Sequence, residues 1–490
     1  MEAMDTNKGL LIIVALALVG ALSVLIVSNE PNVLLQAFFG LLLLVVAFLS
    51  TPASLYILVF SMLLSPEFLV GGLKGGDAAL DREITLRFDD FLLVIIGFVW
   101  LAKMAVFKQG ALSLRTPLNG PFMFYIAMTA VSTLIGTLEG RVNGMTGFFF
   151  LLKYYEYVFV YFMVASSVET QKQVKHLLIA GLATCFLVSL FAISQIPGVE
   201  RASAPFEGET GEPNTLGGYL VFMLAIATGL LLTKGSVPRR LPLFIFLIAG
   251  AVGLAATLSR ASFVAAGIVV LIVTGHAMFR KPLLAPVILI MLLASPWWAP
   301  DAVTQRIFFT FTQPVEEGQI RIGSVRLDTS TSARLRSWQQ AVDIWKAHPL
   351  LGAGVTGAPF MDTMYPRVVS EAGTVGLVAF LILIGAVFRM GFAAHRHATD
   401  PFERGLALGF LLGFAGLLVH AIGANTFIIV RIMEPFWLVT ALVVRGFMIS
   451  QAKQQSETGP KTQPDIPIQD EARATRPALV RPSWVEHRNR

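Results

Sequence analysis

Arginine is concentrated in one polar stretch of an otherwise apolar chain, at residues 298–370. A planar guanidinium binds phosphate or carboxylate oxygens through two parallel hydrogen bonds, so clustered arginines are typical of anion sites. The stretch contains Arg306, Arg321, Arg326, Arg334, Arg336 and Arg367, and Arg201 lies in an earlier polar segment. This pattern predicts a site for an anion that is bound to a lipid at a membrane surface.

Carboxylates in the same segments are candidates for proton transfer, because a general base must reach the hydroxyl that it deprotonates. The available groups are Asp362, Glu371, Glu207 and Glu209, and Asp362 is the first choice. Glu371 has an alternative structural role, in which it pairs with an arginine or caps the helix that follows. His420 could supply an imidazole, or it is a packed polar residue inside a membrane helix.

Metal ligands are not evident in these polar segments, which lack an Asp-x-Asp pair or another obvious cluster. No metal and no other cofactor is therefore expected, because arginine can supply the positive charge that a metal would otherwise provide. Lys153 and Glu156 are two further ionisable residues, three positions apart in an apolar run. At this spacing they could satisfy each other on one helical turn.

Membrane helices must hold these residues in place. A mean hydropathy of +0.71, with 55% hydrophobic and 14% charged residues, excludes a soluble domain. A helix needs roughly 20 apolar residues to cross the hydrocarbon core. Such runs lie near residues 9–28, 32–50, 53–70, 90–107, 121–138, 147–167, 175–195, 215–233, 241–258, 261–279, 282–298, 371–390, 403–422 and 428–448. The sequence predicts an all-α polytopic membrane protein with about 12–14 transmembrane helices.

Lysine and arginine in the short connections predict the orientation of the chain. If the N-terminus is cytoplasmic, the inner connections carry Lys103, Lys108, Arg115, Lys172, Lys175, Lys234, Arg239, Arg240, Arg280, Lys281, Arg389, Arg396 and Arg404. The segments near Glu30, Glu139–Gly144, Pro197–Asn214 and 298–370 then face the periplasm or the cell exterior. The predicted organisation is N-terminal membrane helices at 1–297, a periplasmic loop with amphipathic helices at 298–370, C-terminal membrane helices at 371–449, and a disordered cytoplasmic tail at 450–490.

The outer loop contains an amphipathic helix in the segment TSARLRSWQQAVDIWKAHPLLGAG at 331–354. Arg334, Trp338, Ala341, Val342 and Trp345 recur at helical spacing, and the run stops at the following His-Pro pair and glycine turn. A tryptophan-rich helix of this kind can rest on the lipid interface with its arginines turned toward head groups.

Several segments together resemble the O-antigen ligase and polysaccharide polymerase superfamily. They are GEPNTLGGYL at 211–220, TLSRASFVAAGIVVLI at 257–272, RLRSWQQAVDIWKAHPLLGAG at 334–354 and SEAGTVGLVAFL at 370–381, with weaker similarity in ITLRFDDFLL at 84–93 and FFFLLKYYEYVFVYFMV at 148–164. The resemblance implies a GT-C-type membrane glycosyltransferase that uses an undecaprenyl diphosphate-linked oligosaccharide as donor. Its arginine positions match Arg201, Arg260 and Arg334, with Arg336 and Arg367 next in line for the diphosphate.

The resemblance also bears on the reaction. Family ligases carry a His-Asn pair shortly before the Glu-x-Gly that matches Glu371 and Gly373, whereas the corresponding stretch here is Asp362-Thr363, followed by Tyr365. This departure favours a polymerase that adds repeat units to a growing glycan acceptor at the periplasmic face of the bacterial inner membrane. A flippase and a chain-length regulator are the further partners that the family implies.

The sequence also fits two alternatives to a polymerase, a ligase and a transporter. A ligase to lipid A core would differ from a polymerase in its acceptor rather than in its donor site. A transporter or flippase of lipid-linked anions would move its substrate without chemistry, although the halves of the chain show no convincing internal repeat. The chain has a net charge of +6, but its basic residues do not form a stripe interleaved with aromatic residues. Nucleic acid is therefore not an expected partner.

Overall fold

A computed structural model of the protein describes residues 45–46, 48–69, 85–107, 115–198, 201–207, 211–280, 283–294, 297 and 300–458. The predicted run at 9–28, most of that at 32–50, Glu209 and the chain beyond Thr458 lie outside these residues. The chain divides into two units, Met1–Ser450 and Gln451–Arg490, and the description below concerns the first.

Almost all of the regular secondary structure in the described residues is helical. The earlier ones are α3 (Thr51–Leu64), α4 (Phe88–Phe107), α5 (Asn119–Leu138), α6 (Gly144–Ser167), α7 (Gln171–Ser194), α8 (Pro213–Leu232), α9 (Leu241–Ala256) and α10 (Arg260–Arg280). The later ones are α11 (Leu284–Leu293), α13 (Asp301–Thr312), α14 (Thr329–Ala347), α15 (Met364–His397), α16 (Pro401–His420), the 3₁₀ turn η1 (Thr426–Ile428) and α17 (Val430–Thr458). Two short antiparallel pairs complete the fold: β1 (Glu67–Leu69) with β2 (Thr85–Arg87), and β3 (Arg321–Ile322) with β4 (Val325–Arg326).

Seven of these helices are long and apolar enough to cross a bilayer: α5, α6, α7, α8, α15, α16 and α17. Shorter apolar helices occupy Thr51–Leu64, Leu241–Ala256 and Arg260–His276. The prediction of an all-α, multi-pass membrane protein is therefore confirmed. Within the predicted run at 282–298, residues Leu284–Leu293 form α11, and α13 begins at Asp301, after the run.

Local sequence signals explain where the membrane helices begin. Thr170 caps α7 in a reciprocal arrangement with Gln173, and Asp400 caps α16 by accepting a hydrogen bond from the backbone N–H of Phe402 at 3.1 Å. Each cap satisfies backbone N–H groups that the first helical turn leaves unpaired. Pro401 follows at the first helical position, where its missing N–H costs nothing.

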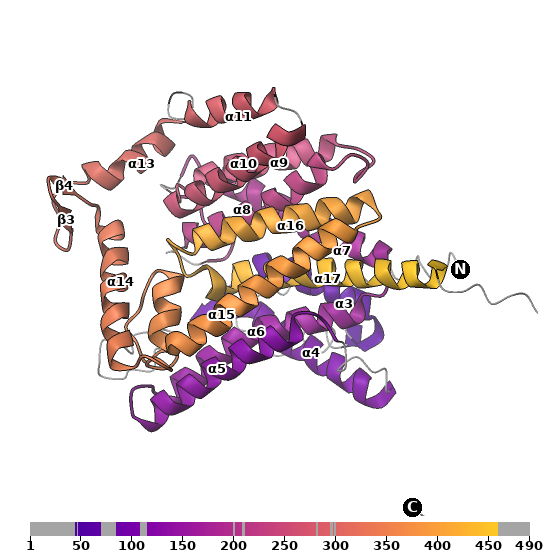
Figure 1. Ribbon diagram of the computed structural model, residues 1–490, viewed down its shortest axis with the longest axis horizontal. Helices are drawn as coiled ribbons and strands as arrows, with labels where there is room; N and C mark the ends of the chain where they lie inside the picture. The colour runs from indigo at the N-terminus through magenta and orange to yellow at the C-terminus, as the bar shows by residue number, and fades with distance from the viewer. Residues whose placement is uncertain are drawn as a thin grey trace, which may run out of the picture. The chain divides into compact units, whose positions relative to one another are not determined.

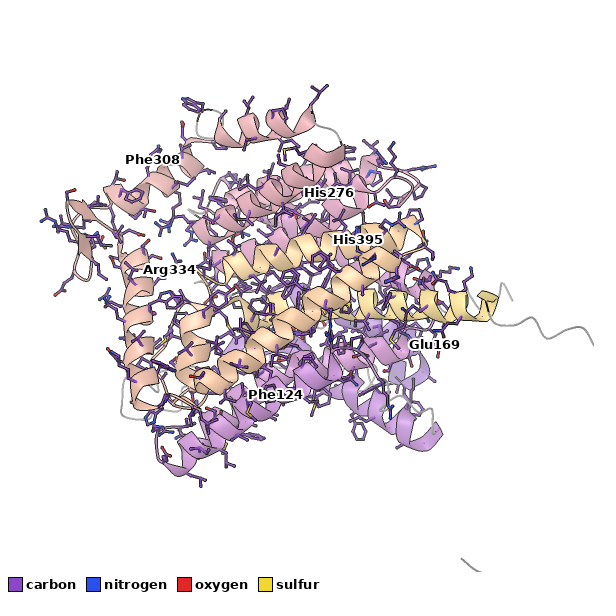
Figure 2. All side chains as sticks on the ribbon, in the orientation of Figure 1. Phe124, Glu169, His276, Phe308, Arg334 and His395 are labelled. Atoms are coloured by element: carbon purple, nitrogen blue, oxygen red, sulfur yellow. The ribbon has the colours of Figure 1, made fainter. Side chains whose placement is uncertain are left out.

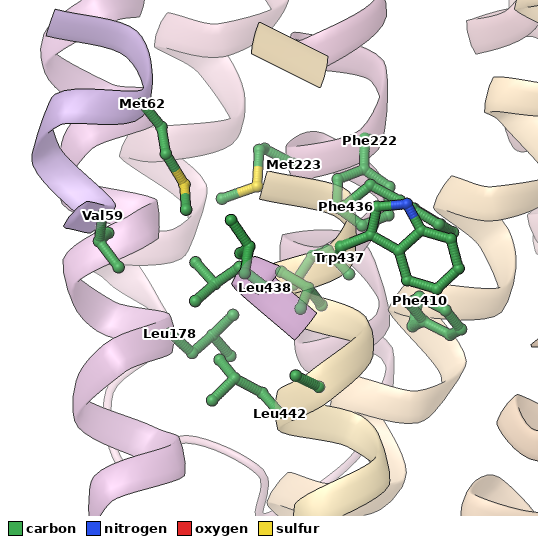
Figure 3. Packing of buried hydrophobic residues seen from close by; sticks show 14 of the residues in the cluster. Val59, Met62, Leu178, Phe222, Met223, Phe410, Phe436, Trp437, Leu438 and Leu442 are labelled. Atoms are coloured by element: carbon green, nitrogen blue, oxygen red, sulfur yellow. The ribbon is translucent and has the colours of Figure 1, made fainter. Parts of the chain in front are cut away.

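The core of the bundle forms where α8 meets α16. Glycines on both helices allow close approach, because a Cβ on Gly229 would collide with the backbone of Gly409. Beside this contact, Phe222, Phe410 and Phe436 pack in a buried aromatic cluster, with ring centroids 5.6–6.4 Å apart (Figure 3). Aromatic contacts of this geometry add to the stabilisation from burial.

The elements that carry several of the arginines, α13, the β3–β4 hairpin and α14, lie at one end of the long helices (Figure 1). Figure 1 shows α14 at an angle to the long helices α15 and α16, with α13 and the β3–β4 hairpin preceding it. The predicted amphipathic helix is confirmed as α14, which ends at Ala347 just before the His-Pro pair. Ala341 of α14 packs in a small buried cluster with Ala358 and Met361, so one face of this helix rests on protein.

Candidate functional site

Arginines from four separate elements lie within electrostatic reach of one another, and we call them the arginine cluster. They are Arg201 in the segment 201–207, Arg260 at the start of α10, Arg306 on α13 and Arg334 on α14. Burial, together with the charges of Arg306, Arg260 and Arg334, lowers the pKa of Arg201 to about 10. Repulsion of this kind is relieved when an anion binds between the guanidinium groups.

Arg260 is the anchor of the cluster. Its Nη2 donates to Asp328 Oδ2 at 2.5 Å, and its Nη1 donates to Thr310 Oγ1 at 2.6 Å. Burial disfavours ionisation of Asp328, but hydrogen bonds from Arg260 and Thr331 outweigh this effect and hold the pKa of Asp328 below its usual value. Since Asp328 also caps α14 and Thr310 belongs to α13, Arg260 connects α10 to both outer helices.

Arg334 has unused hydrogen-bonding capacity within the described residues. It is half-buried, and its Nε is buried without a hydrogen-bond partner among the described residues. Burial lowers the pKa of Arg334, Arg260 and Arg306 lower it further, and Asp362 and Asp328 oppose the shift. A buried guanidinium donor without a partner is costly, so this position favours a ligand that accepts a hydrogen bond.

Arg201 is held by the loop around it. Its Nε donates to the carbonyl oxygen of Thr257 at 3.3 Å, which ties the segment to the turn before α10. Gln195 also holds this segment in place, because its Nε2 donates a hydrogen bond to the carbonyl oxygen of Ser203 at 2.9 Å. Arg431 donates to the carbonyl oxygens of Pro205 and Phe206, at 3.0 and 3.4 Å. The predicted carboxylate Glu207 lies 3.7 Å from Arg431 and belongs to this scaffold.

Asp362 is an exposed residue in the loop between α14 and α15, and it acts electrostatically on Arg334. A carboxylate on the exposed side of a cation cluster can accept a proton from an incoming hydroxyl. Of the predicted carboxylates within the described residues, it is the one that combines exposure with proximity to the cluster.

His420 belongs to a buried chain of polar side chains below the cluster. Its ring nitrogens lie 2.8 Å from Thr426 Oγ1 and 3.1 Å from Ser262 Oγ. Ser262 in turn donates to Ser259 Oγ at 2.8 Å, and Ser259 donates to Asn214 Oδ1 at 2.7 Å. Both nitrogens of the fully buried His420 are thus occupied, which is the geometry of a packed polar residue.

Glu371 and Arg367 form a buried ion pair rather than part of the cluster. Arg367 Nε donates to Glu371 Oε1 at 3.1 Å, and the Tyr154 hydroxyl donates to Glu371 Oε2 at 3.0 Å. Both side chains are almost fully buried, at 3% and 5% exposure. The alternative in which Glu371 pairs with an arginine is confirmed.

The geometry of this region comes from a loop that packs against α15. The φ of Gly373 is +63° within α15, where the helix kinks, and the loop with Gly352 and Gly354 fits against the kink. The backbone N–H groups of Ala353 and Gly354 donate to the carbonyls of Ser370 and Glu371, at 2.8 and 2.9 Å. The PLLGAG segment (349–354) and the SEAG segment (370–373) therefore pack directly against each other.

Two further sets of predicted residues lie elsewhere. Arg336 is exposed on α14, and its Nη2 donates to the carbonyl oxygen of Gly318 at 2.7 Å. Lys153 pairs with Glu156 at 3.5 Å as the spacing predicted, and it also pairs with Asp90. This pair borders a buried network in which Arg87 contacts Asp89 and Glu434. Within the described residues, no His, Cys, Asp and Glu side chains gather into a group of three that could hold a metal ion.

Sequence reasoning selected three of the clustered arginines and did not single out Arg306 for the site. Arg306 appeared only as one of the outer arginines, although its helical spacing to Thr310 could have placed both on one face of a helix. Arg431 was also passed over, because nothing in the sequence links it to the segment 201–207, more than two hundred positions earlier.

Comparison with known proteins adds the family. A family model described as O-antigen ligase matches residues 243–375. This part of the chain is similar to the O-antigen ligase family. The matched range holds Arg260, Arg306 and Arg334 together with Asp362 and Glu371.

The O-antigen ligase match supports an enzyme of the membrane glycosyltransferase type, either a ligase or a related polysaccharide polymerase. Such an enzyme acts on a lipid-linked oligosaccharide and a glycan acceptor in a membrane. A search of curated proteins finds no match to the chain.

Proposed function

We propose that the protein polymerises undecaprenyl diphosphate-linked oligosaccharide repeat units into a surface polysaccharide or exopolysaccharide, at the periplasmic face of the bacterial inner membrane. The observation that carries this proposal is the arginine cluster, in which the buried Nε of Arg334 has no hydrogen-bond partner among the described residues. Arg201, Arg260, Arg306 and Arg334 bind the diphosphate of the donor through charge-assisted hydrogen bonds.

The reaction moves one glycan between two lipid carriers. A hydroxyl of the acceptor attacks the anomeric carbon of the donor glycan, the bond from that carbon to the diphosphate oxygen breaks, and a base takes the hydroxyl proton. The departing diphosphate gains negative charge in the transition state. Fixed guanidinium groups stabilise this charge without reorganising, which is the largest contribution that such a site can make.

Asp362 is the base in this proposal, because it is exposed and lies beside Arg334, whereas Glu371 and His420 are buried in contacts of their own. We expect Asp362→Asn to lower the turnover of the transfer roughly 10²-fold to 10⁴-fold, with donor binding retained, since the amide cannot accept the proton. Single-turnover rates and donor affinity measured on one preparation check this.

The control for Asp362 is Asp343→Asn, since Asp343 is another outer-loop carboxylate and pairs only loosely with Lys346 at 3.5 Å on an exposed helix face. It should leave the rate unchanged. Full activity in Asp362→Asn would remove Asp362 from the mechanism and return Glu371 and His420 to consideration.

Metal independence follows from the use of arginine for charge stabilisation. In liposomes that contain purified protein and an undecaprenyl diphosphate-linked oligosaccharide, we expect a ladder of longer lipid-linked chains on a gel, at the same rate with and without EDTA. Loss of the ladder in EDTA, with recovery on addition of Mg²⁺, would contradict the role given to the arginine cluster.

The same assay separates the polymerase from the ligase. The ligase alternative retains the same donor site and is favoured only by the description of the matching family. Product formation that requires lipid A core would assign the protein as a ligase. If the protein transfers glycan to neither acceptor, the result would favour a transporter of lipid-linked anions over an enzyme.

A further inference from the structure

Helix α13 has a polar face that belongs to the arginine cluster. Arg306 contributes its charge to the cluster, and Thr310, one turn later, accepts the 2.6 Å hydrogen bond from Arg260. The Thr310 carbonyl also accepts the backbone N–H of Asp328 at 3.0 Å. These contacts fix which side of α13 faces the site, because residues four apart lie on the same side of a helix.

The side of α13 turned away from the cluster is apolar and uncovered. Ile307, Phe308 and Phe311 are 47%, 59% and 61% exposed, and none of the residues of this helix is buried. Figure 2 shows Phe308 on α13, away from the core of the bundle. Exposed polar residues such as Gln305 lie on a third face of the helix, between the other two. An isolated helix with this pattern of faces is typical of a membrane interface.

Exposed apolar side chains also occur on the two helices that precede α13 in the chain. Leu271 and Ile272 on α10, and Val287 and Ile290 on α11, are all exposed. In Figure 1, α11 and α13 both lie at the edge of the helical bundle. In a protein with seven candidate spans, such a surface contacts the hydrocarbon of the bilayer.

We propose that α13 lies at the periplasmic surface of the bilayer, between the arginine cluster and the lipid. Its apolar face is inserted in the hydrocarbon. This inference deepens the proposed function and rests on it for the nature of the substrate. A diphosphate that is bound at Arg306 and Arg260 has a polyprenyl chain that passes around the edge of α13 into the bilayer, where it lies along the face formed by Ile307, Phe308 and Phe311.

The placement of α13 can be tested without enzyme activity. Nitroxide labels are attached at Phe308→Cys, Phe311→Cys and Gln305→Cys in liposomes, after Cys185, the single natural cysteine, has been changed to serine. Labels at 308 and 311 should collide more with oxygen than with a water-soluble nickel chelate, and the label at 305 should show the reverse. Water-type accessibility at 308 and 311 would overturn the proposal.

The role in donor binding has a separate kinetic test. The double variant Phe308→Asp, Phe311→Asp should raise KM for an undecaprenyl donor about tenfold, because the apolar contact is lost, with kcat nearly unchanged. KM for a donor with a short, water-soluble prenyl chain should not change. An equal loss with both donors would show a structural role only and overturn the inference about the lipid chain. If the unmodified protein transfers neither donor, the proposed function fails, and the labels alone decide where α13 lies.

Discussion

Replacing Arg334 with alanine should lower the transfer rate roughly 10²-fold to 10³-fold while the protein remains folded, because one fixed charge on the transition state is lost. The effect should be large because Arg334 Nε is buried without a protein partner, so its bond to the substrate has no competitor among the described residues. Its removal relieves repulsion from Arg260 and Arg306 and leaves no buried carboxylate unpaired. Single-turnover transfer in liposomes, with thermal unfolding on the same sample, checks both parts.

Arg336 provides the matched control for Arg334, because it lies two positions along the same helix and is exposed. Arg336→Ala removes the same charge and loses only one surface hydrogen bond to Gly318, so transfer should stay within about twofold of wild type. Equal losses in the two variants would point to a general effect of outer charge. Full activity in Arg334→Ala would remove the arginine cluster as the donor site.

The sequence could predict the membrane helices because their signal is strong and local. Apolar runs near 121–138 and 215–233 coincide with α5 and α8 to within two residues, and prolines and capping residues mark several of the boundaries. Helix α13 starts at Asp301, in the loop for which the sequence predicted amphipathic helices without placing one at this position. Hydropathy averaged over a window does not reveal such a helix, because polar residues lie between its apolar ones.

The site could be predicted only in part, because the sequence does not show which residue each arginine pairs with. Arg201, Arg260 and Arg334 were selected, and the structure brings them together. Arg367 carried the same sequence signal but is neutralised by Glu371, one helical turn later. Composition and position do not reveal such a partner unless the helix that contains both residues is known to be buried.

Gly373→Ala should destabilise the protein by at least about 3 kcal/mol, because backbone strain and overpacking both contribute. The φ and ψ of Gly373 are +63° and −163°, a combination that is essentially restricted to glycine. A Cβ at this position would lie 2.5 Å from the carbonyl carbon of Leu350 and 2.6 Å from the backbone nitrogen of Gly352. These are backbone atoms of the docked loop, so they cannot turn aside as a side chain could.

Gly385 provides the control for Gly373, since it lies in the same helix and nothing surrounds the position that its Cβ would take. Gly385→Ala should be neutral or stabilising by up to about 1 kcal/mol, because alanine favours helix. Thermal unfolding in detergent, followed by the fraction that remains monodisperse, compares the two variants. A Gly373→Ala protein as stable as Gly385→Ala would mean that the loop at 349–354 does not dock against the kink. The loop before Asp362 would then be free of α15, and the position of Asp362 beside Arg334 would lose its physical basis.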